Sequence, residues 1–353
     1  MSRRNATTGA FGIFAAAVWL MAGGGSVLAQ GSRAPEVAAY AGADRAQRLV
    51  EAAKREGVLT MYSNAPTDDN AVLVGAFEKK YGIKVNLYRA SSEQIRQRVL
   101  AEAGARRFDV DFILDNAPAM EALAAEKLLA EVKSPALADV MGRAIPPHRE
   151  WVGFCLNVLV QAYNTDLIKK AELPKSYSDL LDPRWKGRIA IAADDSDWFA
   201  GLMHELGEDA GLKLFRQIAA SNGFSARKGH TLLTNLVAAG EAPLALTVFN
   251  YTAEQLKKRG APIDWFIIAP LISMPNSIAV ARMAPHPSAA VLMFDFMLSD
   301  AQKILADRDY VAVSRKVGSP LDRDQLTVMD SAAVLAQGDK WERLYDQILS
   351  SHP

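Results

Sequence analysis

Polar side chains gather at five points of the chain, four directly after expected strands and one at the start of an expected helix. Taken singly, such residues are more often turn or capping residues than ligand contacts. Taken together they favour a binding cleft, because open α/β sheets bind ligands at the carboxyl ends of their strands. In chain order the groups are Ser63-Asn64, Asp115-Asn116, Asp194 to Trp198, Gly229-His230-Thr231 and Asn250-Tyr251.

The chemistry of these groups is that of binding a polar ligand. Asp115 with Asp195 or Asp197 could hold an ammonium group, because carboxylates are the natural partners of a cation. Tyr251 and Trp198 would offer aromatic faces to the same cation. This combination predicts an organic amine or another polar metabolite as ligand. The amides expected to supply hydrogen bonds are those of Asn64, Asn116 and Asn250.

The fourth group stands at a helix start, where Thr231 is expected to cap the helix. Free backbone N–H groups at such a position favour an anion or a carbonyl oxygen. His230 would matter most if a metal ion or an acidic ligand lay there. The candidate residues contain no visible nucleophile, so we predict a binding protein and not an enzyme.

Strands and helices alternate along the chain, which implies a mainly parallel sheet with helices on both faces. Ser91 and Gln94 are expected to form a capping box, Thr165 to cap a short helix over 166–171, and His286 to be a structural residue at a helix start. Strands are predicted at 58–62, 84–88, 109–114, 189–193, 244–249 and 276–281. Longer helices are predicted at 45–56, 70–81, 92–105, 119–126, 197–206, 209–220, 231–239, 252–259, 287–298 and 339–350.

The N-terminus favours export. Arg3-Arg4 form a short basic region, an apolar stretch covers 10–22, and Val27-Leu28-Ala29 offers small residues to a signal peptidase. The apolar stretch is too short for a membrane span, which needs about 20 residues. We therefore predict a signal peptide over residues 1–29, cleavage after Ala29, and a mature chain free in the periplasm.

Composition limits the function classes further. The chain has 353 residues with 40 basic and 40 acidic side chains, so there is no electrostatic case for binding nucleic acid or a membrane surface. The mature length is enough for two hydrophobic cores. Cys155 is the single cysteine and lies in an apolar run. It cannot form an internal disulfide, so stability in an oxidising compartment must come from packing.

Two segments carry a family resemblance. Tyr163 to Ala192 reads YNTDLIKKAELPKSYSDLLDPRWKGRIAIA, with a Tyr-Asn turn, a P-x-S/T-x-x-D-L helix and a D-P-x-W-x-G turn before a strand. Ala284 to Ala290 reads APHPSAA and is followed by Leu298-Ser299. These patterns closely resemble the extracellular solute-binding proteins of ABC importers, in the branch that includes periplasmic ferric-iron-binding proteins. The resemblance covers roughly Arg45 to Pro320.

The resemblance implies a periplasmic-binding-protein type II-like α/β fold, in which two α/β lobes are joined by two crossing segments and close around a ligand between them. The expected division is 30–160 plus 263–320 for lobe 1, 161–262 for lobe 2, and 321–353 for a C-terminal helical segment. It also implies an ABC permease and its ATPase at the inner membrane as partners, and a monomer. The alternative is a sensory accessory that presents ligand to a membrane receptor or kinase.

In the ferric-iron branch, a His or water, a carboxylate and a tyrosine pair coordinate iron, often with a bound anion. Asp115 stands where the family has its carboxylate, and Tyr251 stands for one tyrosine of the pair. The other tyrosine is Asn250 here, and the histidine position is Ala65 or Pro66. Asp115 and Tyr251 are thus the metal-ligand candidates, and Fe³⁺ is expected as a transported ligand and not as a cofactor.

The anion loop of the branch also differs. It is typically small and hydroxyl-rich, whereas this chain has Asp195-Ser196-Asp197. Two carboxylates would repel a phosphate or carbonate unless a cation lies between them. Relatives in this branch also take up phosphonates, sugar phosphates and thiamine, so the scaffold does not fix the ligand. The ligand stays open between ferric iron or a metal complex and a small polar organic solute.

Overall fold

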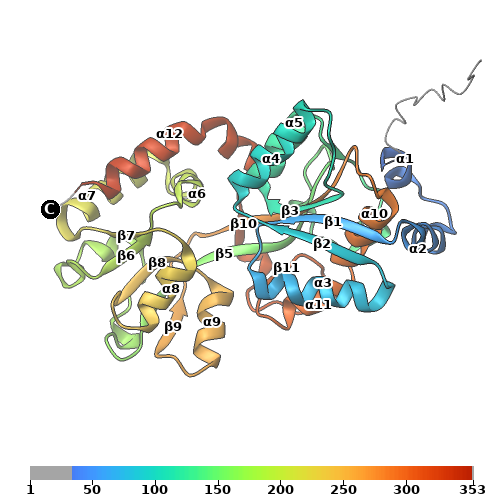
Figure 1. The fold of residues 1–353 in the computed structure, drawn as a ribbon. Coiled ribbons are helices and arrows are strands. Elements are labelled where there is room, and N and C mark those ends of the chain that lie inside the picture. Colours follow the sequence, from blue (N-terminus) through green and yellow to red (C-terminus); the bar gives the residue numbers. More distant parts are fainter. Residues whose placement is uncertain (1–33, 352–353) are drawn as a thin grey trace, which may run out of the picture. The chain divides into compact units, whose positions relative to one another are not determined.

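The computed structural model describes residues 34–351, which lie within one compact unit. Strands run through the middle of this unit, and helices cover them (Figure 1). The predicted signal peptide, residues 1–29, lies outside the described residues.

The strands of the N-terminal part form a first sheet in the order β2-β1-β3-β10-β5. β1, β2 and β3 run parallel, whereas β10 is antiparallel to both β3 and β5. The short strands β4 and β12 pair with β10, and β11 pairs with β5. The bounds are β1 Val58–Ser63, β2 Lys84–Arg89, β3 Phe112–Asn116, β4 Leu129–Ala130, β5 Val152–Asn164, β10 Leu271–Ala281, β11 Val311–Ala312 and β12 Leu326–Val328.

The second sheet is built on the later residues of β5. From Leu159 onward, β5 pairs antiparallel with β8 and β9. β6 then runs parallel to both β8 and β7. The bounds are β6 Ile189–Ala192, β7 Ser225–Arg227, β8 Leu244–Phe249 and β9 Ile263–Phe266.

Helices pack around each sheet. Those around the first are α1 Ala34–Ala39, α2 Arg45–Glu56, α3 Thr67–Tyr81, α4 Ser92–Gly104, α5 Ala117–Ala125, α10 Pro287–Met297 and α11 Asp300–Ala306. Those around the second are α6 Ser196–Leu206, α7 Glu208–Asn222, α8 His230–Ala238 and α9 Asn250–Lys258. The last helix, α12 (Ser331–Leu349), contacts α5 as well as α6 and α7 (Figure 1). It therefore bridges the surroundings of both sheets.

Two groups of buried apolar side chains hold these elements. The larger includes Phe77, Phe112 and Phe296 about the first sheet and continues to side chains of β6, β8, α8 and α9 in the second. The second lies beneath α6, α7 and α12 and includes Phe199 and Phe215. Burying apolar area contributes about 25 cal/mol per Å², so each group is a substantial source of stability.

Local sequence signals set several helix ends. The predicted capping box is present: the Ser91 hydroxyl accepts from the Gln94 N–H, and the Gln94 side chain accepts from the Ser91 N–H. His286 has the predicted structural role. Its backbone N–H and its Nδ1 lie 2.6 Å and 2.9 Å from the carboxylate oxygens of Asp111, so it ties the start of α10 to the entry of β3.

β5 and β10 connect the two sheets. β5 pairs with β10 up to Val158 and with β8 from Leu159, so one strand belongs to both sheets. β10 begins beside β12 and ends beside β3. β5 is continuous across the junction, and residues 267–270 lead from β9 of the second sheet to β10 of the first, so the sheets are joined by two neighbouring backbone segments.

Some predicted bounds were wrong. The helix expected over 166–171 is a turn followed by a short 3-10 helix, Lys170–Glu172. Oδ1 of Asn164 accepts from the Asp166 N–H at 3.0 Å, so an asparagine turn replaces the expected Thr165 cap. α8 starts at His230 after Gly229, with no side-chain cap, so Thr231 does not cap it.

Other bounds shifted along the chain. β3 covers Phe112–Asn116 where 109–114 was expected, because Asp111 uses its carboxylate at the strand entry to accept from the Thr60 N–H at 2.7 Å. α9 starts at Asn250, so Asn250 and Tyr251 are helical and not part of a loop. α12 begins at Ser331 and not at Asp339, because Asp330 caps it by accepting from two backbone N–H groups.

Candidate functional site

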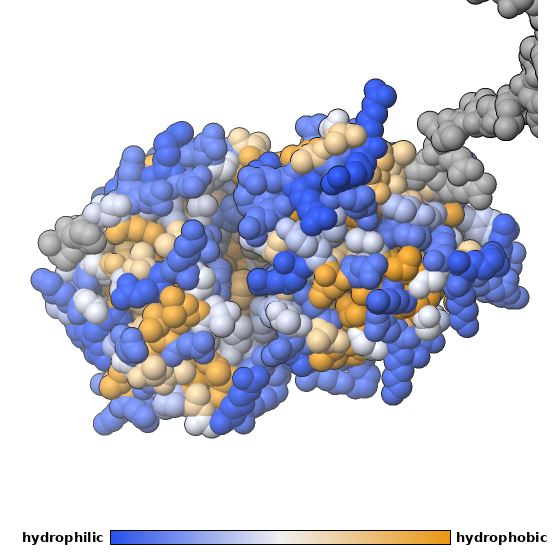
Figure 2. All heavy atoms as spheres, viewed as in Figure 1, coloured by the Kyte–Doolittle hydropathy of each residue, from blue (hydrophilic) through white to orange (hydrophobic). Residues whose placement is uncertain are grey.

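A cavity of about 550 Å³ lies where the carboxyl ends of the parallel strands of both sheets meet. We call it the central cavity. Figure 2 shows this face hollowed between the two sheet regions, with many hydrophilic residues around the hollow. Its walls come from the segments after β1, β2 and β3 on one side and after β6, β7 and β8 on the other. This is the location expected for a ligand in open α/β sheets.

Eight of the residues that we predicted for the site line this cavity. They reach it from the ends of β1, β3, β6 and β8 and from the start of α8. They are Asn64, Asn116, Asp195, Asp197, Trp198, His230, Thr231 and Tyr251.

The other three, Ser63, Asp115 and Asn250, do not line it. Each is buried and bonded inside the protein: Ser63 Oγ donates to Asn70 Oδ1 at 2.8 Å, and Asn250 Nδ2 donates to the Asp309 carbonyl at 3.1 Å. They support the wall and do not form it.

Asp115 lies behind Asn64. Its Oδ1 accepts from Asn64 Nδ2 at 2.8 Å and from the Asn116 N–H at 2.8 Å. Burial raises the pKa of Asp115 to about 6, because the carboxylate is taken from water without a cationic partner. Its function in the structure is therefore to orient Asn64, whose amide lines the cavity.

Asp195 and His230 are neighbours in the cavity wall that the second sheet forms. Nε2 of His230 lies 2.9 Å from Oδ1 of Asp195, although the ring is not aligned for a hydrogen bond with it. Burial lowers the pKa of His230 to about 4. Burial also raises the pKa of Asp195 well above its ordinary value, and the charges of Asp194 and Asp197 add to the rise. Both shifts reflect the cost of charge in a dry site.

The His230 ring begins a series of stacked rings along the cavity. It lies 4.1 Å from the Phe249 ring with the planes 3° apart. Phe249 stacks on Tyr251 at 5.5 Å, and Tyr251 stacks on Tyr310 at 4.0 Å. Tyr310 precedes β11 of the first sheet, so the series connects the two sheet regions.

Trp198 has a different role from the one predicted. It is only 2% exposed, and its ring packs against Tyr177 and Phe215 in the second core. It borders the cavity but its faces are covered. Tyr251 is in the ring series just described, so the open aromatic faces expected for a cation are not present at these two residues.

The floor of the cavity is made by residues that we did not predict. Asn157 and Leu159 come from β5, and Ile272, Met274 and Asn276 come from β10. Each set is spaced by two, as expected for side chains on one face of a strand. The signal in the sequence was an asparagine inside each of two mostly apolar strands, since a buried amide is costly unless it finds a partner.

Two cations at the rim were also missed. Arg89 and Lys228 line the cavity and are exposed. Arg89 Nε donates to the Ala65 carbonyl at 3.3 Å. Arg89 is the last residue of β2 and Lys228 follows β7, so the rule that points to strand ends would have found both.

The described residues of the cavity do not form a cluster of metal-binding side chains. Within residues 34–351, no group of three or more His, Cys, Asp or Glu side chains could hold a metal ion. Tyr251 lines the cavity whereas Asp115 does not. Their assignment as metal ligands stays a prediction.

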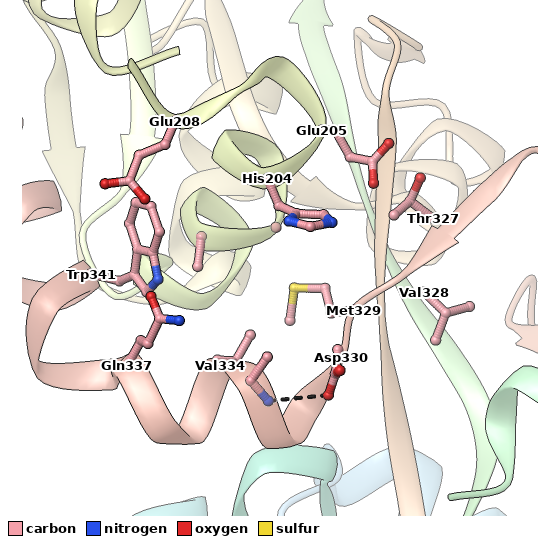
Figure 3. A pocket seen from close by; sticks show the side chains of 13 residues that line it. His204, Glu205, Glu208, Thr327, Val328, Met329, Asp330, Val334, Gln337 and Trp341 are labelled. Carbon is pink, nitrogen blue, oxygen red and sulfur yellow. Dashed lines mark hydrogen bonds between the residues drawn. The ribbon is translucent and has the colours of Figure 1, made fainter. Parts of the chain in front are cut away.

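A second cavity, of about 400 Å³, lies between α6 and the start of α12 (Figure 3). Two of its carboxylates have partners: Asp330 caps α12, and Glu208 accepts from Lys340 at 2.7 Å. His204 and Glu205 on α6 are exposed. Met329 lines both cavities, so this one lies directly behind the central cavity.

Across the described part of the chain, no helix combines the length and apolar character needed to cross a membrane.

Comparison with known proteins identifies relatives of this chain. Residues 110–330 match the family described as "Bacterial extracellular solute-binding protein". The chain is 34% identical over 181 residues to the "Fe(3+)-binding periplasmic protein" of Serratia marcescens, which covers 50% of this chain and 52% of that protein. It thus spans about half the length of that relative.

Solved structures agree on the fold. Iron-bound HitA from Pseudomonas aeruginosa has a TM-score of 0.72 at 23% identity, covering 82% of this chain and 99% of that one. The periplasmic binding protein AfuA from Actinobacillus pleuropneumoniae, with exogenous fructose-6-phosphate bound, has a TM-score of 0.70 at 20% identity, covering 84% and 98%.

These likenesses, with two α/β sheets joined by β5 and β10, confirm the predicted type II-like periplasmic-binding-protein fold. The family match covers more than half of the chain and extends over both sheets. The chain belongs to the bacterial extracellular solute-binding protein family.

Proposed function

We propose that the protein is the periplasmic solute-binding component of an ABC-type import system. It captures a ligand in the central cavity, closes around it, and delivers it to a membrane permease and its ATPase. The observation that carries this proposal is the cavity itself, which takes its walls from the strand ends of two sheets. A ligand held by both walls favours the closed arrangement, since it contacts both only when they are close.

The closing motion would be a hinge. β5 belongs to both sheets and β10 pairs with it at the junction, so a change of backbone angles near Val158 and Ser273 would turn one sheet relative to the other. We retain the division into lobe 1 (30–160 and 263–320), lobe 2 (161–262) and a C-terminal segment (321–353). Within it, Ile263–Phe266 pairs with β5 in the second sheet, so the return to the first lobe follows Phe266.

The ligand is ferric iron, a metal complex, or a small polar organic solute. Iron is supported by the Serratia relative, which is named for binding Fe(3+), and by the iron-bound Pseudomonas structure. An organic solute is supported by the Actinobacillus structure, which holds fructose-6-phosphate. A cavity of about 550 Å³ fits either a complex or a solute, because small-molecule sites are usually about 300–1,000 Å³.

The remaining parts of the proposal concern export and partners. We propose cleavage of residues 1–29, a free and monomeric mature protein in the periplasm, and binding without turnover. The relatives that support this are named as periplasmic binding proteins. Steady turnover of a bound ligand would contradict it.

The test is native mass spectrometry with elemental analysis on protein isolated gently from the periplasm. Stoichiometric iron would identify a metal ligand, and a bound organic mass would identify a solute. The ligand-loaded and stripped forms are then compared by small-angle X-ray scattering. A radius of gyration that is the same in both forms would contradict closure, and an unchanged import rate in a strain lacking the protein would contradict delivery.

A further inference from the structure

The two strands that join the sheets also form the floor of the central cavity. Asn157 of β5 and Asn276 of β10 line it beside Met274, and Met274 pairs with Asn157 in the strand register. A hinge needs only backbone angles that can change, and this function alone would not explain polar side chains that face a cavity. The floor is therefore a ligand-contacting surface as well as a joint.

The buried oxygens around this floor lack partners. Oδ1 of Asn157 and Oδ1 of Asn276 have none among the residues that the structure describes, and the same holds for Oδ2 of Asp195. Asn276 is 6% exposed and Asp195 is 5% exposed, so bulk water does not satisfy them freely. A buried acceptor without a donor costs about 1–3 kcal/mol. A ligand that supplies donors would remove this cost.

Charge on the wall favours a cationic donor. Asp195 is the fully buried acid, and Asp194 and Asp197 lie on the same short segment after β6. Lys228 and Arg89 are the cations that line the cavity, and both are exposed at its rim. The deep part of the cavity is thus rich in oxygen acceptors, and a cationic ligand would offset the burial that raises the pKa of Asp195. It suits a compact positive group with several N–H donors.

The remaining floor favours an organic group over a bare ion. Leu159, Ile272 and Met274 line the cavity between the polar residues, and Met329 closes its rear. Hard metal ions require several oxygen ligands at about 2.0–2.6 Å and gain nothing from hydrocarbon. An aliphatic or aromatic portion of a solute does gain from it.

We propose that the central cavity binds an organic solute that carries a protonated amino group. Asp195 receives the ammonium group, and Asn157 and Asn276 accept hydrogen bonds from further N–H or O–H groups of the solute. The hydrocarbon portion lies on Met274 and its apolar neighbours. This inference rests on the proposed solute-binding function and names the class of solute.

Thermal-shift measurement on the full mature protein tests which class of solute it binds. One set of probes holds amines: putrescine, agmatine and the basic amino acids. The other set holds ferric citrate, hexoses, hexose phosphates and dicarboxylates. We expect an amine to raise the melting temperature, and titration calorimetry then gives its Kd.

Three substitutions test the assignment of residues. Asp195→Asn should weaken the binding of that amine by at least roughly thirtyfold, because it removes a buried charge partner. Asn157→Leu and Asn276→Leu should each weaken it roughly tenfold. Asn86→Leu is the matched control, since Asn86 is an exposed strand residue outside the cavity and should leave the Kd unchanged. The melting temperature without ligand checks that each variant is folded.

The outcomes separate this inference from the proposed function. If only ferric citrate or other non-amines stabilise the protein, solute binding stands and the amine assignment is wrong. Binding of an amine that is unaffected by Asp195→Asn and by both floor variants would also overturn it. If no probe of either set stabilises the protein, the result counts against both proposals.

Discussion

The rings of Tyr251 and Tyr310 stack with their centroids 4.0 Å apart and their planes 22° apart. Tyr251 lies at the start of α9 beside the second sheet, whereas Tyr310 precedes β11 of the first sheet. The Tyr310 hydroxyl donates to Asp69 of α3 at 2.5 Å, which anchors it on its own side. The pair is therefore an aromatic contact between the two sheet regions at the cavity wall.

Substitutions at Tyr251 distinguish a stacking role from a metal-ligand role. Tyr251→Phe keeps the ring, so we expect the Kd of the ligand found by mass spectrometry to change less than about threefold. Tyr251→Leu removes the stack, which is worth about 0.5–1.5 kcal/mol, and should weaken binding up to about tenfold. Calorimetric titration measures both. Loss of binding in Tyr251→Phe as complete as in Tyr251→Leu would make the phenol oxygen a direct ligand contact.

Asp115 is expected to act through Asn64. Asp115→Asn keeps an oxygen that can accept from Asn64 Nδ2, so binding should be nearly unchanged. Asp115→Ala removes this acceptor, frees the Asn64 amide, and should weaken binding roughly tenfold. An equal loss of ligand affinity in the two variants would show that the negative charge of Asp115 itself is needed, as a metal site would require.

The stability of the protein should depend on pH through His230. Its folded pKa of about 4 is below the ordinary value of 6.5, so between these values the unfolded chain binds more protons than the folded one. The free energy of unfolding therefore rises with pH across this window, and the contribution is lost as pH falls towards 4. Between pH 4 and 6.5, the free energy of unfolding of the wild type should rise by up to about 3 kcal/mol more than that of His230→Asn.

Guanidinium unfolding of both proteins at several pH values measures this difference. Titrating groups that do not contact His230, such as Asp115, affect both proteins and cancel in the comparison, whereas Asp195, 2.9 Å from His230, contributes to the measured difference. Parallel profiles for wild type and His230→Asn would mean that the imidazole is not held in its neutral form.

Gly153 of β5 is expected to tolerate no side chain. A Cβ there would lie 3.1 Å from the Cβ atoms of Ala144 and Pro275 and 3.3 Å from the Ala144 carbonyl oxygen. These neighbours are short or part of the backbone, so Gly153→Ala should lower the free energy of unfolding by about 1–3 kcal/mol. Gly75→Ala is the control: its Cβ meets nothing within 4 Å inside α3, and it should stabilise by about 0.5–1 kcal/mol. Denaturant melts compare the two.

The sequence predicted the location of the cavity better than its individual contacts. Asn64 and Asn116 line the wall, whereas Ser63 and Asp115, one residue earlier, are turned away from it. Successive residues of a strand point to opposite faces, so an error of one position exchanges a wall residue for a buried one. Polar residues after an apolar run thus identify the strand end but not which side chain faces the ligand.

The residues of the cavity floor could not be predicted for a different reason. Asn157 and Asn276 lie inside strands, far apart in the chain, and meet only because β5 and β10 pair. Such pairing is a property of the tertiary structure, so the residues around each asparagine do not show that the two lie side by side. The helix expected over 166–171 is absent for a local reason. One hydrogen bond, from the Asp166 N–H to the side-chain oxygen of Asn164, was enough to replace a marginal helix with a turn.

The position of β10 has a consequence for how the chain reaches its native state. β10 stands between β3 and β5, yet the chain supplies it only after β6, β7, β8 and β9. During synthesis β1 can pair with β2 and β3 early, whereas β3 and β5 lack the strand that lies between them until late. Pairings of such long sequence separation form slowly. We expect the first sheet to stay incomplete for much of the synthesis of the chain, a delay that would suit the export proposed above.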